Sequence, residues 1–349
     1  MVKSKKKNKK AELSTPQVFM NIKTDYGFKK IFGNKVLLIA FVNALEMLPN
    51  PIVDVEYLPL EQLGHTEKNR KAIYDVYVKT ENGQYFIIEM QIAEQAYFAD
   101  RMLFYVGHST AGQAPKGKII TTNKQGKIVK KNWNYKIDGV YMITILDFVM
   151  FKEKIAKDII IEYVEMVRRK AKLLFTGKFE LVTIELPKFN KSVEELSDIT
   201  DKWLHSIIHM EELASCPEVM ADDEIFKELY ETAKINKLTN EEMELYKQSV
   251  LEYDDVRDAV DYAKAEARAE GERRGEKRGE KRGEKRGRAE GRIEGRTEGR
   301  IEGRTEGRTE GRIEERNRFV TNLYNLKFSL KQIAELAGLT EKEVFEIID

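Results

Sequence analysis

Two carboxylates and one amide stand in a short stretch of the chain at a spacing that suits metal-ion chemistry. The stretch YDVYVKTENGQYFIIEMQI, residues 74–92, carries Asp75 near its start and Glu89 and Gln91 near its end. Two carboxylates brought close together repel unless they share a proton or a cation. A Mg²⁺ ion takes one or two carboxylates and completes its shell with waters and substrate phosphates. The pair therefore suits metal-assisted attack on phosphorus.

A β-hairpin would bring the two carboxylates together. Residues 72–80 and 84–92 are rich in Tyr, Val, Ile and Phe, and Asn82-Gly83 supplies the positive φ angles of a tight turn. If this turn pairs the strands, Asp75 and Glu89 lie together at the end far from the turn. Spacing alone leaves a second interpretation open, in which both acids point outward from a solvated face of the sheet.

The surrounding sequence, residues 18–262, predicts one mixed α/β domain with a helical extension. Apolar residues recur at helical spacing from about Val18 to Leu48, and a proline-flanked stop follows. The remaining expected elements are a strand at 52–60, a helix at 94–112, strands at 140–151, 158–167 and 178–189, and helices from 192 onward. Strands and helices in mixed order are typical of α/β and α+β folds.

Composition favours a soluble protein in a reducing compartment. The 349 residues are 42% hydrophobic and 34% charged, with a net charge of +1, so attraction to nucleic acid must come from local patches. The single cysteine, Cys216, excludes a disulfide scaffold. No apolar run is long enough to span a bilayer. We expect a cytoplasmic protein whose lysine-rich residues 1–17 form a disordered tail, either solubilising or gripping phosphates.

Residues 263–316 carry a glycine at every fourth position from Gly271 to Gly311. Each glycine costs about 0.5–1 kcal/mol relative to alanine in a helix, and like charges recur four residues apart. This composition favours a solvated, partly helical linker or stalk. The alternative is a glycine stripe that packs two helices together in a homo-oligomer. A four-residue period exceeds 3.6, so such a pair would have to coil right-handedly.

The last segment, residues 317–349, has the layout of a small helix-turn-helix module. Ser329 and Thr340 are expected as N-caps, and Gly338 as a C-cap, of two short helices. The second helix is acidic and lacks arginine, which is unfavourable for reading DNA bases. The module can equally be one that only packs or oligomerises.

Several segments in order resemble the Rpn family, the recombination-promoting nucleases, within the PD-(D/E)XK nuclease superfamily. The resemblance covers roughly residues 21–212, and its motifs are TDYGFKKIFGN at 24–34, NRKAIYDVYVKTENGQYFIIEMQ at 69–91, DRMLFYVGH at 100–108 and YKIDGVYMITILDFVMF at 135–151. It implies a restriction-endonuclease-like αβββαβ core and a Mg²⁺-dependent DNA endonuclease. Such an enzyme would act in recombination or transposon-related DNA exchange.

Carried over by position, the resemblance makes Asp75 and Glu89 metal ligands, with the Met90 carbonyl as a third. Gln91 takes the place of the superfamily lysine that orients the attacking water, but an amide lacks the charge of a lysine. Asp25 matches an early acidic position that would reach the metal through water. The rival function is an inactive DNA-binding or assembly protein built on a decayed nuclease domain.

Three further residues are candidates for contacts with DNA or for support of the reaction. Lys71 shares a strand face with Asp75, so it would either lend charge to the reaction or contact the DNA backbone. Arg101 and Tyr105 lie one helical turn apart and would either contact phosphates or stack on each other at the helix surface.

Overall fold

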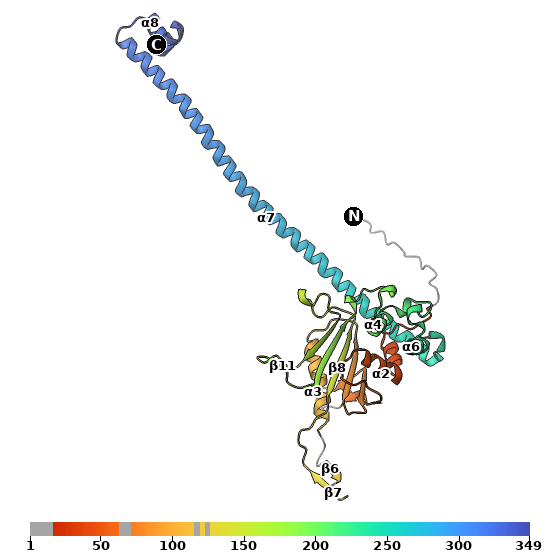
Figure 1. Ribbon diagram of the computed structural model, residues 1–349. Coiled ribbons are helices and arrows are strands. Elements are labelled where there is room, and N and C mark those ends of the chain that lie inside the picture. Colours follow the sequence, from red (N-terminus) through yellow and green to blue (C-terminus); the bar gives the residue numbers. More distant parts are fainter. Residues whose placement is uncertain (1–16, 63–70, 115–118, 123–125) are drawn as a thin grey trace. The chain divides into compact units, whose positions relative to one another are not determined.

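The computed structural model of the chain describes residues 17–62, 71–114, 119–122 and 126–349 (Figure 1). The expected basic tail, 1–17, lies outside these ranges except for its last residue. The chain divides into two compact units, Met1–Ala263 and Lys264–Asp349, and each is described by itself.

The chain enters unit 1 through two short helices, where the sequence predicted one continuous helix. Helix α1 covers Asp25–Phe32 and helix α2 covers Lys35–Ala44. The prediction was wrong because the Asn34 side chain accepts hydrogen bonds from the next backbone N–H groups and so caps a new helix. Thr24 caps α1 in the same way, which places Asp25 at the first position of that helix.

A six-stranded mixed sheet forms the centre of unit 1 (Figure 1). Its order is β1-β4-β5-β8-β12-β9, in which β5, β8 and β12 run parallel and the other neighbours antiparallel. The bounds are Val55–Tyr57 for β1, Val76–Thr80 for β4, Tyr85–Gln91 for β5, Val140–Leu146 for β8, Ile161–Glu165 for β9 and Phe179–Glu185 for β12. Helix α3, Phe98–Gly112, connects β5 to β8. The expected αβββαβ core is therefore confirmed.

Helices cover both faces of the sheet. Even-numbered and odd-numbered side chains of a strand therefore pack into two different cores. On β5, the even-numbered residues Phe86, Ile88 and Met90 join the core formed with α1, α2, α4 (Ile199–His209) and α6 (Glu224–Thr232). Tyr77 and Ile87 join a second core with the apolar side of α3. Because side chains alternate along a strand, Glu89 and Gln91 belong to the face that α3 covers.

Every predicted strand is shorter in the structure than in the sequence prediction, and two of these differences bear on the site. The run 72–80 divides into β3, Ala72–Ile73, and β4, with a bend at Asp75 between them. The run 140–151 ends as a strand at Leu146, where the chain bends. Small two-stranded ribbons pair β2 (Glu61–Gln62) with β3, β6 (Ile119–Thr122) with β7 (Ile128–Lys131), and β10 (Val167–Arg168) with β11 (Leu173–Leu174).

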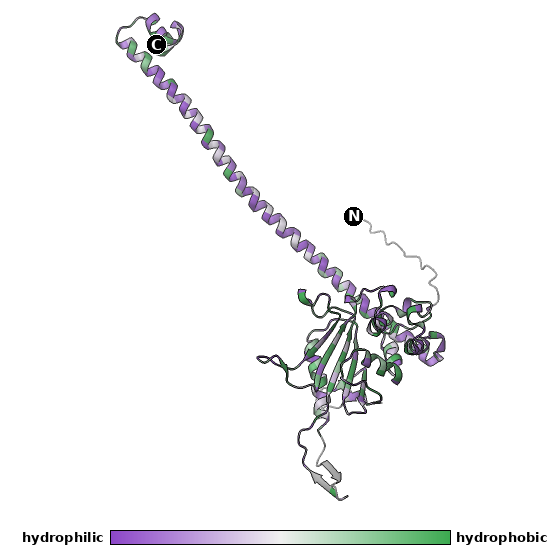
Figure 2. Cartoon of the chain, viewed as in Figure 1, coloured by the Kyte–Doolittle hydropathy of each residue, from purple (hydrophilic) through white to green (hydrophobic). Residues whose placement is uncertain are grey.

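Helix α7, Asn240–Asn325, contains the whole glycine-periodic region. The expectation of partial helix was wrong, since 263–316 is helical throughout. Ion pairs four residues apart support its first half, among them Arg268–Glu272 and Glu284–Arg288. Once a helix has started, each further residue adds one hydrogen bond. This gain offsets the cost of each glycine, so the helix continues through all of them. Figure 2 shows that this helix is hydrophilic along its length, and none of the described helices is long and apolar enough to cross a membrane.

The end of unit 2 confirms the predicted caps. Ser329 caps α8, Leu330–Ala337, and Thr340 caps α9, Glu341–Ile348, each through a reciprocal capping box. Gly338 closes α8 in the left-handed conformation, with φ at 66°. A small apolar cluster joins these two helices to the last turns of α7.

Candidate active site

Asp75 and Glu89 interlock through the backbone at the end of the hairpin. The Asp75 N–H donates to Glu89 Oε1 at 3.0 Å, and the Met90 N–H donates to Asp75 Oδ2 at 3.0 Å. The bend between β3 and β4 turns Asp75 toward β5 so that both bonds form. Glu89 is only 1% exposed, so the interpretation of an outward-facing, solvated pair does not hold for it.

Burial raises the pKa of both carboxyl groups, and the charge of Asp75 raises that of Glu89 further. The pKa of Glu89 rises to about 8, first because the group is buried and second because Asp75 is close. Burial also raises the pKa of Asp75. The charges of Arg101 and Lys29 oppose this rise at both acids. A divalent cation is the partner that such a pair lacks, because it stabilises both charged forms at once.

Arg101 reaches the acid pair from α3. Its Nη2 lies 3.3 Å from Glu89 Oε2, and its Nη1 donates to Gln91 Oε1 at 3.2 Å. The Gln91 amide in turn donates to Glu89 Oε2 at 3.5 Å. Gln91 therefore ties Arg101 to Glu89, and the charge that the amide cannot supply comes from the next helix.

Tyr105 holds the Arg101 side chain in place. The guanidinium carbon lies 5.1 Å from the centroid of the Tyr105 ring, within the range of a cation–π contact. The ring is buried against the sheet, where the Tyr74 hydroxyl donates to the Tyr105 carbonyl. The two side chains therefore contact each other, and contact of this pair with phosphate stays a prediction. The stack aims Arg101 at Glu89.

Helix α1 brings a second cation that the sequence analysis did not single out. Lys29 forms an ion pair with Asp25 at 2.7 Å, and its charge lowers the pKa of both Asp75 and Glu89. Asp25 acts in the opposite sense on Asp75, so it also lies near the pair. The available signal was that Lys29 follows Asp25 by four residues and so shares its side of the helix.

The structure gives Lys71 an ion-pair partner other than Asp75 and Glu89. It forms an ion pair with Glu61 across the β2–β3 ribbon, and its side chain is exposed. It lines a cavity of about 510 Å³ together with Arg101 and Tyr105. The break between β3 and β4 separates it from Asp75, so the shared strand face that linked the two residues in the sequence prediction does not exist.

The backbone of β5 offers one further oxygen to the pair. The Gln91 carbonyl accepts from the Asp147 N–H on the β8 side of the strand. The N–H and C=O groups of one strand residue point to the same side, and successive residues alternate. The Met90 carbonyl therefore points to the β4 side, as its N–H does, toward Asp75.

Asp147 is a second residue that the sequence analysis missed. Parallel strands end at the same edge of a sheet, so the residue after β8 lies beside the end of β5. Its carboxylate accepts from the Tyr253 hydroxyl at 2.9 Å and lies 4.0 Å from Lys23 Nζ. These contacts fasten the first part of α7 to the edge of the sheet that carries the acid pair.

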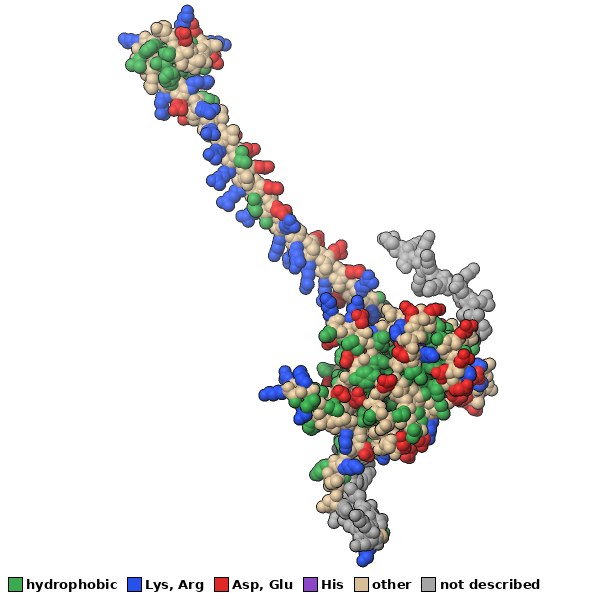
Figure 3. Space-filling model, in the orientation of Figure 1, with side chains coloured by type: hydrophobic (Ala, Val, Ile, Leu, Met, Phe, Trp, Pro, Cys, Tyr) green, Lys and Arg blue, Asp and Glu red, His purple; other side chains and the backbone are tan. Residues whose placement is uncertain are grey.

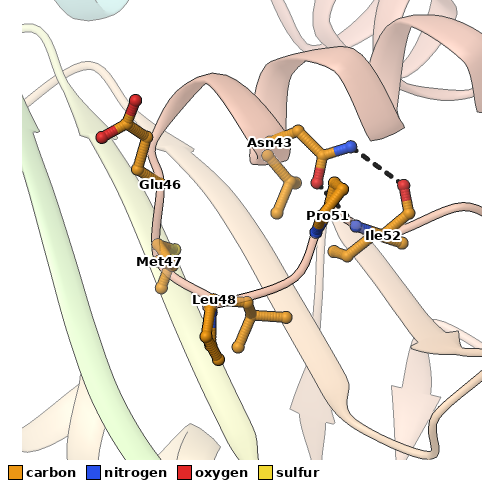
Figure 4. Close-up of a pocket in the computed structure, with 8 residues that line it drawn as sticks. Asn43, Glu46, Met47, Leu48, Pro51 and Ile52 are labelled. Atoms are coloured by element: carbon orange, nitrogen blue, oxygen red, sulfur yellow. Dashed lines mark hydrogen bonds between the residues drawn. The ribbon is translucent and has the colours of Figure 1, made fainter.

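A cavity of about 620 Å³ lies between α1 and the start of α7 and is lined by Asp25 and Lys29. A separate hollow of about 390 Å³ follows α2, where the Asn43 side chain bonds both backbone groups of Ile52 and the Glu46 carboxylate points away (Figure 4). This hollow has no cluster of ionisable groups. Among the described cavities, those lined by Arg101 and by Lys29 contain a cation whose charge acts on the acid pair.

The residues present fit a hard cation that keeps most of its shell from water and substrate. Within the described ranges, no three His, Cys, Asp or Glu side chains are grouped to hold a metal by themselves. The donor set is two carboxylates with a backbone carbonyl nearby, which suits Mg²⁺ and not Zn²⁺.

Residues 22–263 match the family model of the PD-(D/E)XK nuclease family transposases. The chain belongs to this family. The match confirms the resemblance seen in the sequence and extends past residue 212 to include the helices after the sheet. The chain has no significant match among curated proteins or solved structures. Membership supports a nuclease-related function, and the geometry at Glu89 indicates which residues would carry it.

Proposed function

We propose that this protein is a Mg²⁺-dependent DNA endonuclease that acts in recombination or transposon-related DNA exchange. The observation that carries the proposal is the acid pair, half-buried Asp75 and buried Glu89, joined by two backbone hydrogen bonds and faced by Arg101. Two ionisable groups with raised pKa values cost stability in a fold and are kept where a function uses them. Family membership makes DNA the expected substrate.

In this proposal Asp75, Glu89 and the Met90 carbonyl hold the ion, with Asp25 contributing through water. The ion would lower the pKa of a bound water and balance charge at the phosphorus. Gln91 orients Arg101, and Arg101 and Lys29 bring positive charge from opposite sides of the acid pair toward the phosphate. Lys71, 53% exposed in its side chain, contacts the DNA backbone at most.

The remaining parts of the proposal concern the setting of the enzyme. The single Cys216 and the absence of a membrane-spanning helix among the described residues fit action on DNA in the cytoplasm. The glycine-periodic helix and the terminal module then serve either contact with DNA or assembly of several copies of this chain into a homo-oligomer.

Nicking of supercoiled plasmid tests the proposal. The wild-type protein should convert plasmid to open circles with Mg²⁺ and not with EDTA, and Asp75→Asn and Glu89→Gln should each abolish conversion. Glu94→Gln is the matched control, because Glu94 follows the same strand but is exposed and pairs only with Lys152. Equal nicking by Glu89→Gln and Glu94→Gln would refute the assignment. No nicking by any form, with DNA binding retained, would favour the inactive DNA-binding protein.

A further inference from the structure

Helix α7 carries its charges on two opposite sides. Between residues 271 and 312 there are fifteen Lys and Arg against ten Glu, a net charge of +5, whereas the whole chain is +1. The side chains of this segment are exposed along its whole length. Figure 3 shows the basic side chains gathered along one side of the helix and the acidic ones along the other.

A strict four-residue repeat could not keep that separation. Each residue advances about 100° around a helix, so a step of four drifts by about 40°. The glutamates at 272, 276, 280 and 284 therefore sweep about 120°. The next glutamate, at 290, follows after six residues. A spacing of six residues rotates the position backwards around the helix by about 120°. The glutamates at 290, 294, 298 and 302 then repeat the first four positions, eighteen residues or five turns later.

The same shift keeps the basic residues together on the other side. Before Gly287 the spacers read Glu-Lys/Arg-Arg after each glycine, and after Gly291 they read Arg-Ile/Thr-Glu. At about 100° per residue, twelve of the fifteen basic residues lie outside the sector of about 120° that holds those eight glutamates. The change of spacer therefore preserves one basic side across both halves of the segment.

Seven arginines between residues 271 and 312 have no acidic residue three or four positions away, and five of them lie in the second half of the segment. The residues three and four positions away on either side are only Gly, Ala, Ile, Thr or another Arg for Arg292, Arg296, Arg300, Arg304 and Arg308. In the described chain these five make no ion pair, whereas Arg286 and Arg288 in the first half pair with Glu290 and Glu284. Like charges stacked four apart weaken a helix. An external polyanion would relieve that repulsion.

We propose that the basic side of α7, residues 271–312, binds the phosphate backbone of duplex DNA. Successive arginines rise by about 6 Å along the axis, and a duplex presents one charge per about 1.7 Å, so every arginine finds a phosphate within reach of its flexible side chain. The inference relies on the proposed function only in taking DNA as the polyanion. It adds a second, sequence-independent contact outside the nuclease unit.

A second copy of the helix fits this surface less well. The glycine stripe drifts through a full turn between Gly271 and Gly307, at about 40° per repeat, so straight helices would share no continuous close seam. The exposed Ile293, Ile301 and Ile313 also lie on different sides, which leaves no apolar stripe to bury.

Fluorescence anisotropy with a labelled duplex tests the proposal on the full-length chain in EDTA, where cleavage does not interfere. Changing Arg292, Arg296, Arg300 and Arg304, the four of these arginines that lie outside the glutamate sector, to Gln should weaken binding at least tenfold and flatten the slope of log Kd against log salt by about 3–4, at about 0.9 per phosphate contact. The matched control changes the four glutamates at 290, 294, 298 and 302 to Gln and should tighten binding. Far-UV circular dichroism checks that both variants keep their helix.

A third variant separates sidedness from net charge. It exchanges Arg and Glu within the three repeats at 292/294, 296/298 and 300/302, beginning with Arg292→Glu and Glu294→Arg, and so keeps composition and charge while moving these three basic groups into the sector that holds the glutamates. We expect it to bind as weakly as the Arg→Gln variant. Wild-type affinity and salt slope in the exchange variant would overturn the proposal.

Two other outcomes are equally decisive. If the Arg→Gln variant keeps its DNA affinity but sediments as a smaller species than wild type, the surface binds a second copy and the proposal is wrong. A wild-type chain that binds DNA through α7 in EDTA but never nicks plasmid with Mg²⁺ would refute only the proposed nuclease function.

Discussion

Removing the charge of Glu89 should stabilise unit 1 in the absence of metal. The fold raises the pKa of Glu89 from 4.5 to about 8, first through burial and second through the charge of Asp75. At pH 7 the unfolded chain has released this proton and the folded chain has not, and a difference of this size costs about 3 kcal/mol. Glu89→Gln escapes that cost but loses the 3.3 Å contact with Arg101, so we expect a net gain of about 1–3 kcal/mol.

The sign of the pH dependence follows from the same shift. The wild-type stability contribution of this group is complete below pH 4.5, falls as pH rises, and stays low above about 8, because the folded pKa is the higher one. The advantage of Glu89→Gln over wild type should therefore grow from pH 5 to pH 8. A saturating Mg²⁺ concentration should reverse the order, since the ion binds the native acid pair and stabilises only wild type, by about 4.1 kcal/mol at 1,000 times its Kd.

Tryptophan fluorescence during heating gives the measurement. Trp203 is buried in the core of unit 1, and unit 2 contains no tryptophan, so the signal reports on the nuclease unit. A gain of 1–3 kcal/mol corresponds to a rise in Tm of about 2–10 °C. The matched control is Glu185→Gln, because Glu185 is equally buried but pairs with Lys188 at 3.0 Å and accepts from two backbone N–H groups. It should lower Tm. A lower Tm for Glu89→Gln in EDTA at pH 8 would refute the reasoning.

The remaining predictions concern the cations and a cap. Arg101→Leu should slow plasmid nicking and move the acidic limb of its pH–rate profile upward, because the Arg101 charge holds the pKa of Glu89 down; an unmoved limb would contradict this. Lys29→Ala should reduce nicking at least tenfold. Lys30→Ala removes the ion pair with Glu242 of α7 and should mainly lower Tm. Equal nicking rates in the two variants would count against a role for Lys29. Ser329→Ala should destabilise the terminal module by about 1 kcal/mol, measured by hydrogen exchange in its helices.

The parts of the site that the sequence predicted are those set by local rules. The two-residue period of the strands and the Asn82-Gly83 turn were enough to place Asp75 beside Glu89, with Gln91 on the same face. The caps of the terminal helices followed from residues three positions apart in the same way.

The parts that the sequence did not predict depend on contacts between distant elements. Lys29 comes to the acids only because α1 packs against the edge of the sheet, and Asp147 because β8 runs parallel to β5. The bend at Asp75 lies between Lys71 and the acids. It is stabilised by the hydrogen bond from the Asp75 N–H to the Glu89 side chain on the next strand, which no local sequence pattern predicts. The division of the predicted helix at Asn34 is the exception, because it is a local effect: the Asn34 side chain accepts from the N–H groups of Val36 and Leu37 and so starts α2.

The six-residue step between Glu284 and Glu290 constrains how the length of this chain can vary through evolution. Gain or loss of one four-residue repeat turns every later charge by about 40° and shifts it by about 6 Å along the axis. Nine repeats, or one block of eighteen residues, restore the original direction. Related chains that share the surface should therefore differ in length by such blocks, or should carry a second six-residue step that compensates for the repeats they have gained.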